Sequence, residues 1–143
     1  MVIKDGMSRT ERILKRTIDF ILSLIGLVIL SPVFLLVYIF LKKQNDGPVV
    51  FRQERIGYRG KPFFILKFRT MRTDSEENGT PQLACKGDDR LTPVGKILRE
   101  HHLDELPQLL NVFMAEMSFV GPRPERQYFL DRIMDVNPDY LYI

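Results

Sequence analysis

The sequence is organised around one long apolar run, Phe20 to Leu41, which contains 22 residues and no charge. A helix needs about 20 predominantly apolar residues to span the hydrocarbon core of a bilayer. Only 102 residues follow the run, too few to cover nearly all its faces in a water-soluble fold. A signal peptide has an apolar region of about 7–15 residues that ends at small residues, whereas this run ends at Lys42-Lys43. The run therefore predicts a protein that lives on a membrane.

Ser31 and Pro32 lie at the middle of this run. Proline has no N–H, so its hydrogen bond to the Val28 carbonyl is lost and its ring crowds the preceding turn. Each half of the run has 11 residues, or ~16 Å of helix, against a hydrocarbon core of about 30 Å. One interpretation is a bent helix that enters the membrane and returns, with the Ser31 hydroxyl bonded to a freed carbonyl. The other is a straight span with a proline kink.

Basic residues flank the apolar run on both sides. Four lie in the eleven residues before it and two directly follow it: Arg9, Arg12, Lys15, Arg16, Lys42 and Lys43. Because lysine and arginine mark the cytoplasmic side of a membrane segment, basic residues at both ends favour the re-entrant interpretation. Asp19 lies four residues after Lys15, a spacing that predicts an ion pair along a helix. We expect an N-terminal helix and re-entrant hairpin over residues 1–43 and a cytoplasmic domain over residues 44–143.

Positive charge is concentrated between residues 52 and 72. The whole chain has a formal net charge of +3. This window has a net charge of +6, because it holds one acid, Glu54, and seven basic residues: Arg52, Arg55, Arg59, Lys61, Lys67, Arg69 and Arg72. A basic patch beside a membrane favours anionic headgroups or a phosphate-bearing substrate. No nucleic-acid-binding signature accompanies the patch, so nucleic acid is not expected as a partner.

We expect an α+β fold, in which the re-entrant hairpin joins a basic β-hairpin and amphipathic or interfacial helices. Residues 49–51 predict a short strand, residues 58–61 a turn and residues 63–71 a longer strand. Alternation along the longer strand puts basic side chains on one face of the hairpin. Residues 74–90 predict a polar loop with solvated acids. Thr92-Pro93 is typical of a helix start, because the hydroxyl caps the helix and proline fits its first position.

The segment Leu103-Asp104-Glu105-Leu106-Pro107-Gln108 holds the acids best placed for chemistry. Proline is tolerated in a first helical turn, so a helix is expected to begin close to Asp104 or Glu105. Both carboxylates would then lie at the positive end of a helix dipole, which favours their ionised form and attracts phosphate. An ionised aspartate beside phosphate-binding groups can act as a nucleophile at phosphorus. The alternative is that Asp104 only caps the helix and Glu105 occupies its first turn.

A stiff loop is predicted around Arg123, between Met117 and Glu125. Pro122 and Pro124 fix the backbone on either side, so the guanidinium has little freedom left to lose on binding. An arginine fork suits a phosphate oxygen or a carboxylate. The structural alternative is an ion pair with a nearby acid.

Histidine and cysteine do not predict a transition-metal site. His101 and His102 lack a third ligand at metal-site spacing, so we interpret both as residues at a helix end. The single cysteine, Cys85, excludes an internal disulfide and agrees with a reducing compartment.

Seven segments, taken in order, resemble the bacterial sugar transferase family. They are KRTIDF, the apolar run broken by Ser-Pro, GPVVFRQERIG, GKPFFILKFRTMR, DDRLTPVGKILRE, LDELPQLLNV and MSFVGPRPE. The likeness covers residues 15–126 in unbroken order, which is more specific than any single motif. Members of this family are monotopic phosphoglycosyl transferases. They move a sugar phosphate from a nucleotide sugar, usually a UDP-sugar, to a polyprenol phosphate, with release of UMP, and the product starts a surface glycan or glycoprotein oligosaccharide.

The resemblance implies roles for particular residues. The family's Asp-Glu pair matches Asp104, as nucleophile through a phosphosugar-enzyme intermediate, and Glu105, as an acid/base or a support for the metal. The family's Mg²⁺ lies at this pair, where it would offset diphosphate charge. The arginine five residues before the pair contacts phosphate in the family and matches Arg99, and the arginine between two prolines matches Arg123. The Ser-Pro break of the family's re-entrant helix matches Ser31-Pro32.

The resemblance also implies the setting, which is the cytoplasmic face of a bacterial inner membrane. The expected partners are a UDP-sugar, a polyprenol phosphate and the lipid bilayer, while the sugar, the polyprenol length and the oligomeric state stay open. Members usually continue into a segment resembling PGxTG, whereas this sequence ends at Ile143, so we expect it to be C-terminally truncated. The alternative function is a non-catalytic membrane anchor whose basic hairpin binds headgroups or a partner of a glycan-assembly complex. Release of UMP from a UDP-sugar separates the two functions.

Overall fold

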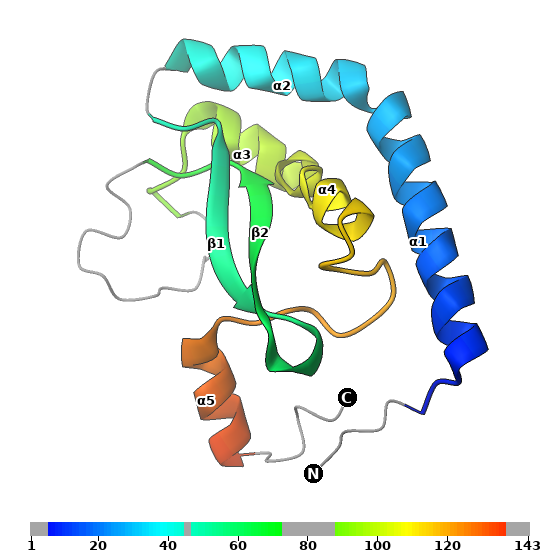
Figure 1. Ribbon diagram of the computed structural model, residues 1–143. Helices are drawn as coiled ribbons and strands as arrows, with labels where there is room; N and C mark the ends of the chain where they lie inside the picture. The colour runs from blue at the N-terminus through cyan, green and yellow to red at the C-terminus, as the bar shows by residue number, and fades with distance from the viewer. Residues whose placement is uncertain (1–5, 45–46, 73–87, 137–143) are drawn as a thin grey trace.

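The computed structural model describes residues 6–44, 47–72 and 88–136. Two long helices form an angle around a smaller part of the chain (Figure 1). The elements in order are α1 (Arg9–Ile29), α2 (Ser31–Gln44), β1 (Val50–Ile56), the 3-10 turn η1 (Tyr58–Gly60), β2 (Pro62–Phe68), α3 (Pro93–Glu100), the 3-10 turn η2 (Leu103–Glu105), α4 (Gln108–Phe113) and α5 (Gln127–Val136). The combination of helices with a small antiparallel sheet agrees with the predicted α+β fold.

The boundary between α1 and α2 is the break that Ser31 and Pro32 predicted. α1 ends at Ile29 with Leu30 as its C-cap, α2 begins at Ser31, and the two helices are bent by 60° relative to each other. The Ser31 hydroxyl donates to the Val28 carbonyl at 2.8 Å, which is the acceptor that the Pro32 ring nitrogen cannot serve. In the described part of the chain no single helix is long and apolar enough to cross a membrane. The bent pair meets that test when its two helices are taken together, by length and composition.

The two helices turn their apolar side chains away from the rest of the protein. The buried residues of α1 are the polar Asp19 and Ser23, whereas α2 buries only Val37 and Leu41. Large apolar side chains left exposed on the pair include Ile21, Leu22, Ile25, Val28, Ile29, Leu35, Leu36, Ile39 and Phe40. A helix on the surface of a soluble protein shows the opposite pattern, with its apolar stripe facing the core. An exposed apolar surface of this extent marks contact with lipid or with another protein.

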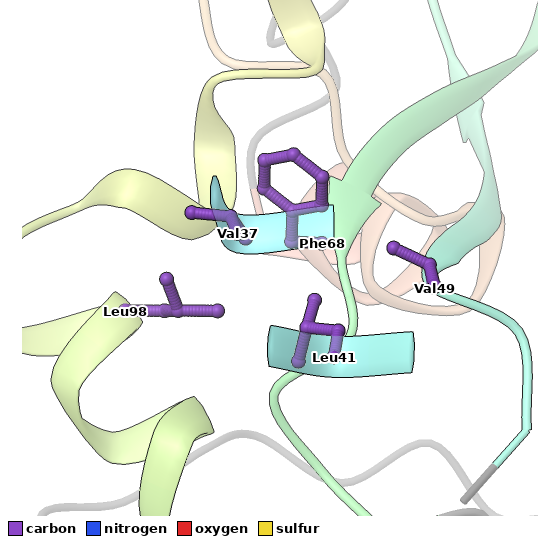
Figure 2. Packing of buried hydrophobic residues seen from close by; sticks show 5 residues of the cluster. All are labelled: Val37, Leu41, Val49, Phe68 and Leu98. Atoms are coloured by element: carbon purple, nitrogen blue, oxygen red, sulfur yellow. The ribbon is translucent and has the colours of Figure 1, made fainter. Parts of the chain in front are cut away.

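The end of α2 is built into the core of the smaller part. Val37 and Leu41 pack with Val49, which directly precedes β1, with Phe68 at the end of β2 and with Leu98 of α3 (Figure 2). Leu41 is completely enclosed. Helix α2 and the hairpin therefore share one hydrophobic core.

Arg69 reinforces this junction from inside. It follows β2 directly and is buried, and its guanidinium donates to the carbonyls of Leu41 at 3.0 Å and Pro48 at 3.2 Å, and also to that of Gly47. Leu41 lies in the last turn of α2, where carbonyl groups lack partners within the helix. One side chain thus fastens the end of α2 to the hairpin.

The hairpin has the predicted antiparallel form with different ends. β1 pairs with β2 so that Arg52 lies opposite Leu66 and Arg55 opposite Phe63. β1 extends to Ile56, beyond the predicted short strand, because pairing with β2 recruits polar residues whose own composition gives no strand signal. β2 ends at Phe68, before the predicted Met71.

The prediction of one basic face on the hairpin holds only in part. Opposed residues of an antiparallel pair share a face, so the register places Arg55 and Lys67 on one face and Arg52 on the other. Arg69 lies in the interior. The concentration of charge in the sequence is therefore distributed between two surfaces and the core.

Helix α3 begins as predicted, at Thr92-Pro93. The Thr92 hydroxyl accepts the Gly95 N–H at 2.9 Å. Gly95 lies against the strand end, where a Cβ would fall 1.9 Å from the Thr70 carbonyl oxygen, so only glycine allows this approach. Most of the loop predicted over residues 74–90 lies outside the described residues. Of its two described acids, Asp89 is exposed as predicted, whereas Asp88 is buried and pairs with Arg90 at 2.5 Å.

Candidate active site

Asp104 and Glu105 lie in η2, the 3-10 turn between α3 and α4. The prediction that a helix begins at these acids is wrong, because α4 begins at Gln108 with Pro107 directly before it. Pro107 has no N–H to bond the Leu103 carbonyl, and that carbonyl instead accepts the Leu106 N–H at 3.3 Å, which closes a 3-10 turn. The acids are thus held by a tight turn. Helix α4 is short and begins after the acids, so its dipole does not account for their ionisation.

Glu105 binds two cations from distant parts of the chain. Its Oε1 accepts from Lys67 Nζ at 3.0 Å and from Arg123 Nη2 at 2.8 Å. Burial alone would raise the pKa of Glu105, but the hydrogen bond and charge of Lys67, together with Arg123, outweigh burial and lower it. The structure therefore brings Arg123 to the Asp-Glu pair. The contact is an ion pair with Glu105, which is the structural alternative that the sequence left open for Arg123.

Asp104 has a different environment from its neighbour. Asp104 is buried, with 6 % of its surface exposed. Burial raises the pKa of the Asp104 carboxyl, with Glu105 acting in the same direction, while the charges of Lys67 and Arg99 act against them. The expectation that both carboxylates have a favoured ionised form is therefore wrong for Asp104. A carboxylate deprived of water is less stabilised and more reactive toward an electrophile.

Arg99 lies in the last turn of α3 and contributes positive charge to this site. Among the described residues, no hydrogen bond or ion pair occupies its guanidinium. Its planar fork is suited to binding two oxygens of one phosphate group. Ser31 and Pro32, in contrast, form the bend between α1 and α2 and do not belong to this cluster.

Lys67 is the site residue that the sequence analysis missed. It was counted in the basic window without a role of its own. Strand alternation places it on the same face as Arg55, but nothing in the sequence relates it to Glu105, 38 positions away. The contact depends on how α4 packs beside the hairpin.

Asn111 of α4 supplies that packing. It is fully enclosed, its Oδ1 accepts the Leu66 N–H at 3.0 Å, and its Nδ2 donates to the Phe64 carbonyl at 2.8 Å and to Glu116 at 2.7 Å. A side-chain amide that satisfies the free edge of β2 fixes α4 at one register on the strand. Figure 1 shows α4 beside β2. The turn before α4 is fixed with it, so both acids are presented to Lys67.

The donor set fits Mg²⁺ better than a transition metal. The described residues contain no group of three or more histidine, cysteine, aspartate and glutamate side chains that could hold a metal. Mg²⁺, however, is commonly held by one or two carboxylates, with substrate phosphates and water completing its shell. Asp104 and the second carboxylate oxygen of Glu105 are oxygen donors of this kind.

One protein family and several known proteins are similar to this chain over most of its length. The family model described as Bacterial sugar transferase matches residues 10–143. The chain is 40% identical, over 89% of its length, to the Putative undecaprenyl-phosphate N-acetylgalactosaminyl 1-phosphate transferase of Bacillus subtilis (strain 168) and covers 70% of that protein. It is 41% identical, over 90% of its length, to the UDP-N-acetylgalactosamine-undecaprenyl-phosphate N-acetylgalactosaminephosphotransferase of Aeromonas hydrophila, of which it covers 30%.

A third relative is the UDP-glucose:undecaprenyl-phosphate glucose-1-phosphate transferase of Escherichia coli (strain K12). The identity is 43% over 82% of this chain and 25% of that protein. The chain thus spans most of the Bacillus relative and less than a third of the other two. Since the family model covers nearly the whole chain, this protein belongs to the bacterial sugar transferase family.

Proposed function

We propose that this chain transfers a sugar 1-phosphate from a UDP-sugar to a membrane polyprenol phosphate, with release of UMP, and so starts the synthesis of a surface glycan or glycoconjugate. The observation that carries the proposal is the buried carboxylate of Asp104 beside the charges of Lys67 and Arg99. The named relatives act on undecaprenyl phosphate, and the outward apolar surface of α1 and α2 supports work at a lipid surface.

The proposed reaction has two steps at Asp104. Its carboxylate attacks the phosphorus that carries the sugar, the bond from this phosphorus to the bridging oxygen breaks, and UMP leaves with that oxygen and its electron pair. An oxygen of the polyprenol phosphate then attacks the same phosphorus. The bond to Asp104 breaks, its carboxylate is restored, and a new diphosphate joins lipid and sugar. Two anionic substrates therefore never have to react directly with each other.

The remaining residues hold charge where the reaction needs it. Arg99 and Arg123 bind oxygens of the diphosphate, and Lys67 offsets negative charge beside Asp104. Because Glu105 already binds Lys67 and Arg123, it holds these two cations in place before substrate arrives. Mg²⁺, when bound by Asp104 and Glu105, would supply further neutralisation of the diphosphate.

A panel of UDP-sugars with undecaprenyl phosphate tests the function. The purified protein in lipid nanodiscs should release UMP with at least one member, and UDP-N-acetylgalactosamine and UDP-glucose are the first two to try. A folded, membrane-bound protein that releases no UMP across the panel would instead support the non-catalytic anchor.

We also propose that α1 and α2 form a re-entrant hairpin with both ends on the cytoplasmic face of a bacterial inner membrane. Cysteines at Gly6 and Lys43, in a Cys85→Ala background, should both react with a membrane-impermeant thiol reagent in inside-out vesicles and neither in intact spheroplasts. The reason is that basic residues flank both ends of the apolar run. Reaction of one position from the outside would establish a straight span.

Arg123→Lys tests the phosphate contact. A lysine keeps the charge near Glu105 but cannot bind two phosphate oxygens in the fork geometry of arginine. We expect kcat/KM for UDP-sugar to fall at least about tenfold, or ~1.4 kcal/mol of transition-state stabilisation. Arg126→Lys, three positions along the chain, is the matched control and should leave turnover nearly unchanged. Normal turnover in Arg123→Lys would restrict Arg123 to a structural ion pair.

A further inference from the structure

The polar side of α1 holds the segment between α4 and the Arg123 loop. Lys15 Nζ donates to the Val120 carbonyl at 2.7 Å and also to the Ser118 hydroxyl. Asp19 Oδ1 accepts the Phe119 N–H at 3.2 Å. Three consecutive residues of the segment are thus bound by two side chains one helical turn apart.

Arg16 adds to the same attachment from the neighbouring position. Its guanidinium donates to the carbonyls of Val112 at 2.6 Å, Phe113 at 3.3 Å and Met117 at 3.2 Å. These contacts fix the end of α4 and the start of the segment. We call Lys15, Arg16 and Asp19 the α1 clamp.

Asp19 is the member of the α1 clamp whose burial is most costly. It is 4 % exposed, on a helix whose other large side chains are mostly apolar and face outward. A buried carboxylate is unfavourable unless charge and hydrogen bonds compensate it. Lys15 at 3.8 Å and the Phe119 N–H are its recorded partners. The proposed reaction makes no use of this acid.

The clamp holds one end of the loop that carries Arg123, and the hairpin holds the other. The Ile56 N–H donates to the Glu125 carbonyl at 2.9 Å, and Arg55 pairs with the Glu125 carboxylate at 3.2 Å. Arg123 lies between these attachments, with 67 % of its side chain exposed and Glu105 as its ion-pair partner. With little packing of its own, Arg123 depends on its loop for its position.

We propose that Asp19 is a positioning residue, which fixes the 118–120 segment and thereby places Arg123 at Glu105 and at the substrate phosphate. The proposal rests on the proposed function and adds a physical link between the membrane helix and the active site. A chain whose α1 is not seated against the 118–120 segment would then bind UDP-sugar poorly even with Asp104 and Glu105 intact.

Asp19→Leu is the direct test. Leucine has the same branched outline, although it is larger, and it tolerates a buried site, but it cannot accept the Phe119 N–H. We expect kcat/KM for UDP-sugar to fall about tenfold in lipid nanodiscs. Asp19→Asn keeps an acceptor oxygen and should recover most of that loss. Ser23→Ala is the matched control, since Ser23 is also buried on this side of α1 but its hydroxyl bonds within the helix, to Phe20.

A double mutant separates positioning from a general structural effect. If Asp19 acts through Arg123, adding Asp19→Leu to Arg123→Ala should cause little further loss, whereas independent effects would multiply. Lys15→Met attacks the same clamp from a less buried position and should show the same lack of additivity. Multiplied losses for both variants would overturn the proposal.

Amide hydrogen exchange gives a measurement that needs no substrate. The Phe119 N–H should exchange faster in Asp19→Leu than in the wild-type or Ser23→Ala proteins, because its acceptor is gone. Unchanged exchange at Phe119 would also overturn the proposal. A wild-type protein that releases no UMP would contradict the proposed function, while exchange at Phe119 would still decide whether the clamp holds the segment.

Discussion

Asp104→Asn should stop the release of UMP and the gain of one sugar phosphate in protein mass when UDP-sugar and Mg²⁺ are supplied without lipid acceptor. The amide has the shape of the carboxylate but cannot serve as a nucleophile at phosphorus. We expect turnover to fall at least about a thousandfold, or ~4 kcal/mol of activation free energy. Intact-protein mass spectrometry and a UMP assay on the same sample measure both events.

The fold should survive this substitution. Because burial raises the pKa of Asp104 above its unfolded value, the folded protein binds the proton more tightly, and ionisation of this residue lowers stability as the pH rises through that range. A neutral asparagine removes this unfavourable charge, so the unfolding temperature at pH 7 should be equal or higher. Loss of activity together with a lower unfolding temperature would point to a structural role.

Glu105→Gln is the internal comparison, because its linkage has the opposite sign. Lys67 and Arg123 lower the pKa of Glu105 in spite of burial. Its ionised form therefore stabilises the fold above the unfolded pKa, and this contribution is lost as the pH falls through the folded pKa. Glutamine should lower the unfolding temperature at pH 7.

One outcome with the wild-type protein would contradict the covalent route through Asp104. If UMP appears only after polyprenol phosphate is added and no adduct forms on Asp104, direct transfer between the two substrates replaces the covalent route.

The bend between α1 and α2 could be predicted because its signals are local. A proline in an apolar run removes one identifiable hydrogen bond, and a serine beside it can bond the freed carbonyl, as Ser31 does with Val28. The Lys15–Asp19 ion pair follows from helical spacing in the same way. Spacing could not predict that Asp19 would also bind Phe119, because that contact depends on where α4 packs against α1.

For the candidate site, the sequence indicated residues that lie together in the structure, but it did not indicate their geometry. Asp104, Glu105 and Arg123 could be named from short motifs. The helix expected at Asp104 is not formed, because Pro107 lacks the N–H that an α-helical turn would need and a 3-10 turn forms instead. A single hydrogen bond decides between the two kinds of turn. The role of Lys67 could not be predicted, because its pairing with Glu105 requires Asn111 to fix α4 on the edge of β2. Contacts of this range require the tertiary fold.

Lys67→Met should have the second-largest effect, and its pH dependence gives the clearest evidence for the role of Asp104. Loss of Lys67 removes one cation from beside Asp104, the proposed nucleophile, and breaks one bond to Glu105. Removing a preorganised charge from a site where negative charge moves costs about a hundredfold in turnover, or ~2.7 kcal/mol. The measurement is kcat/KM for UDP-sugar as a function of pH.

The direction of the pH shift follows from the charges around Asp104. Burial raises the pKa of Asp104, and the positive charge of Lys67 opposes that rise. The carboxylate must be ionised to attack, so kcat/KM should fall as the pH drops through this pKa, on a limb above the ordinary range of aspartate. Without Lys67 the opposing charge is gone and the pKa rises further, so the limb should move to higher pH.

Two variants separate the charge of Lys67 from its shape and from general changes in the hairpin. Lys67→Arg keeps the cation and should leave the acid limb close to its wild-type position, even where turnover falls because the longer side chain fits less well. Lys61→Met makes the same chemical change at an exposed lysine in the hairpin turn and should alter neither rate nor limb. An acid limb that stays in place in Lys67→Met would show that the group titrating in kcat/KM is not Asp104, because the charge of Lys67 acts directly on that carboxyl.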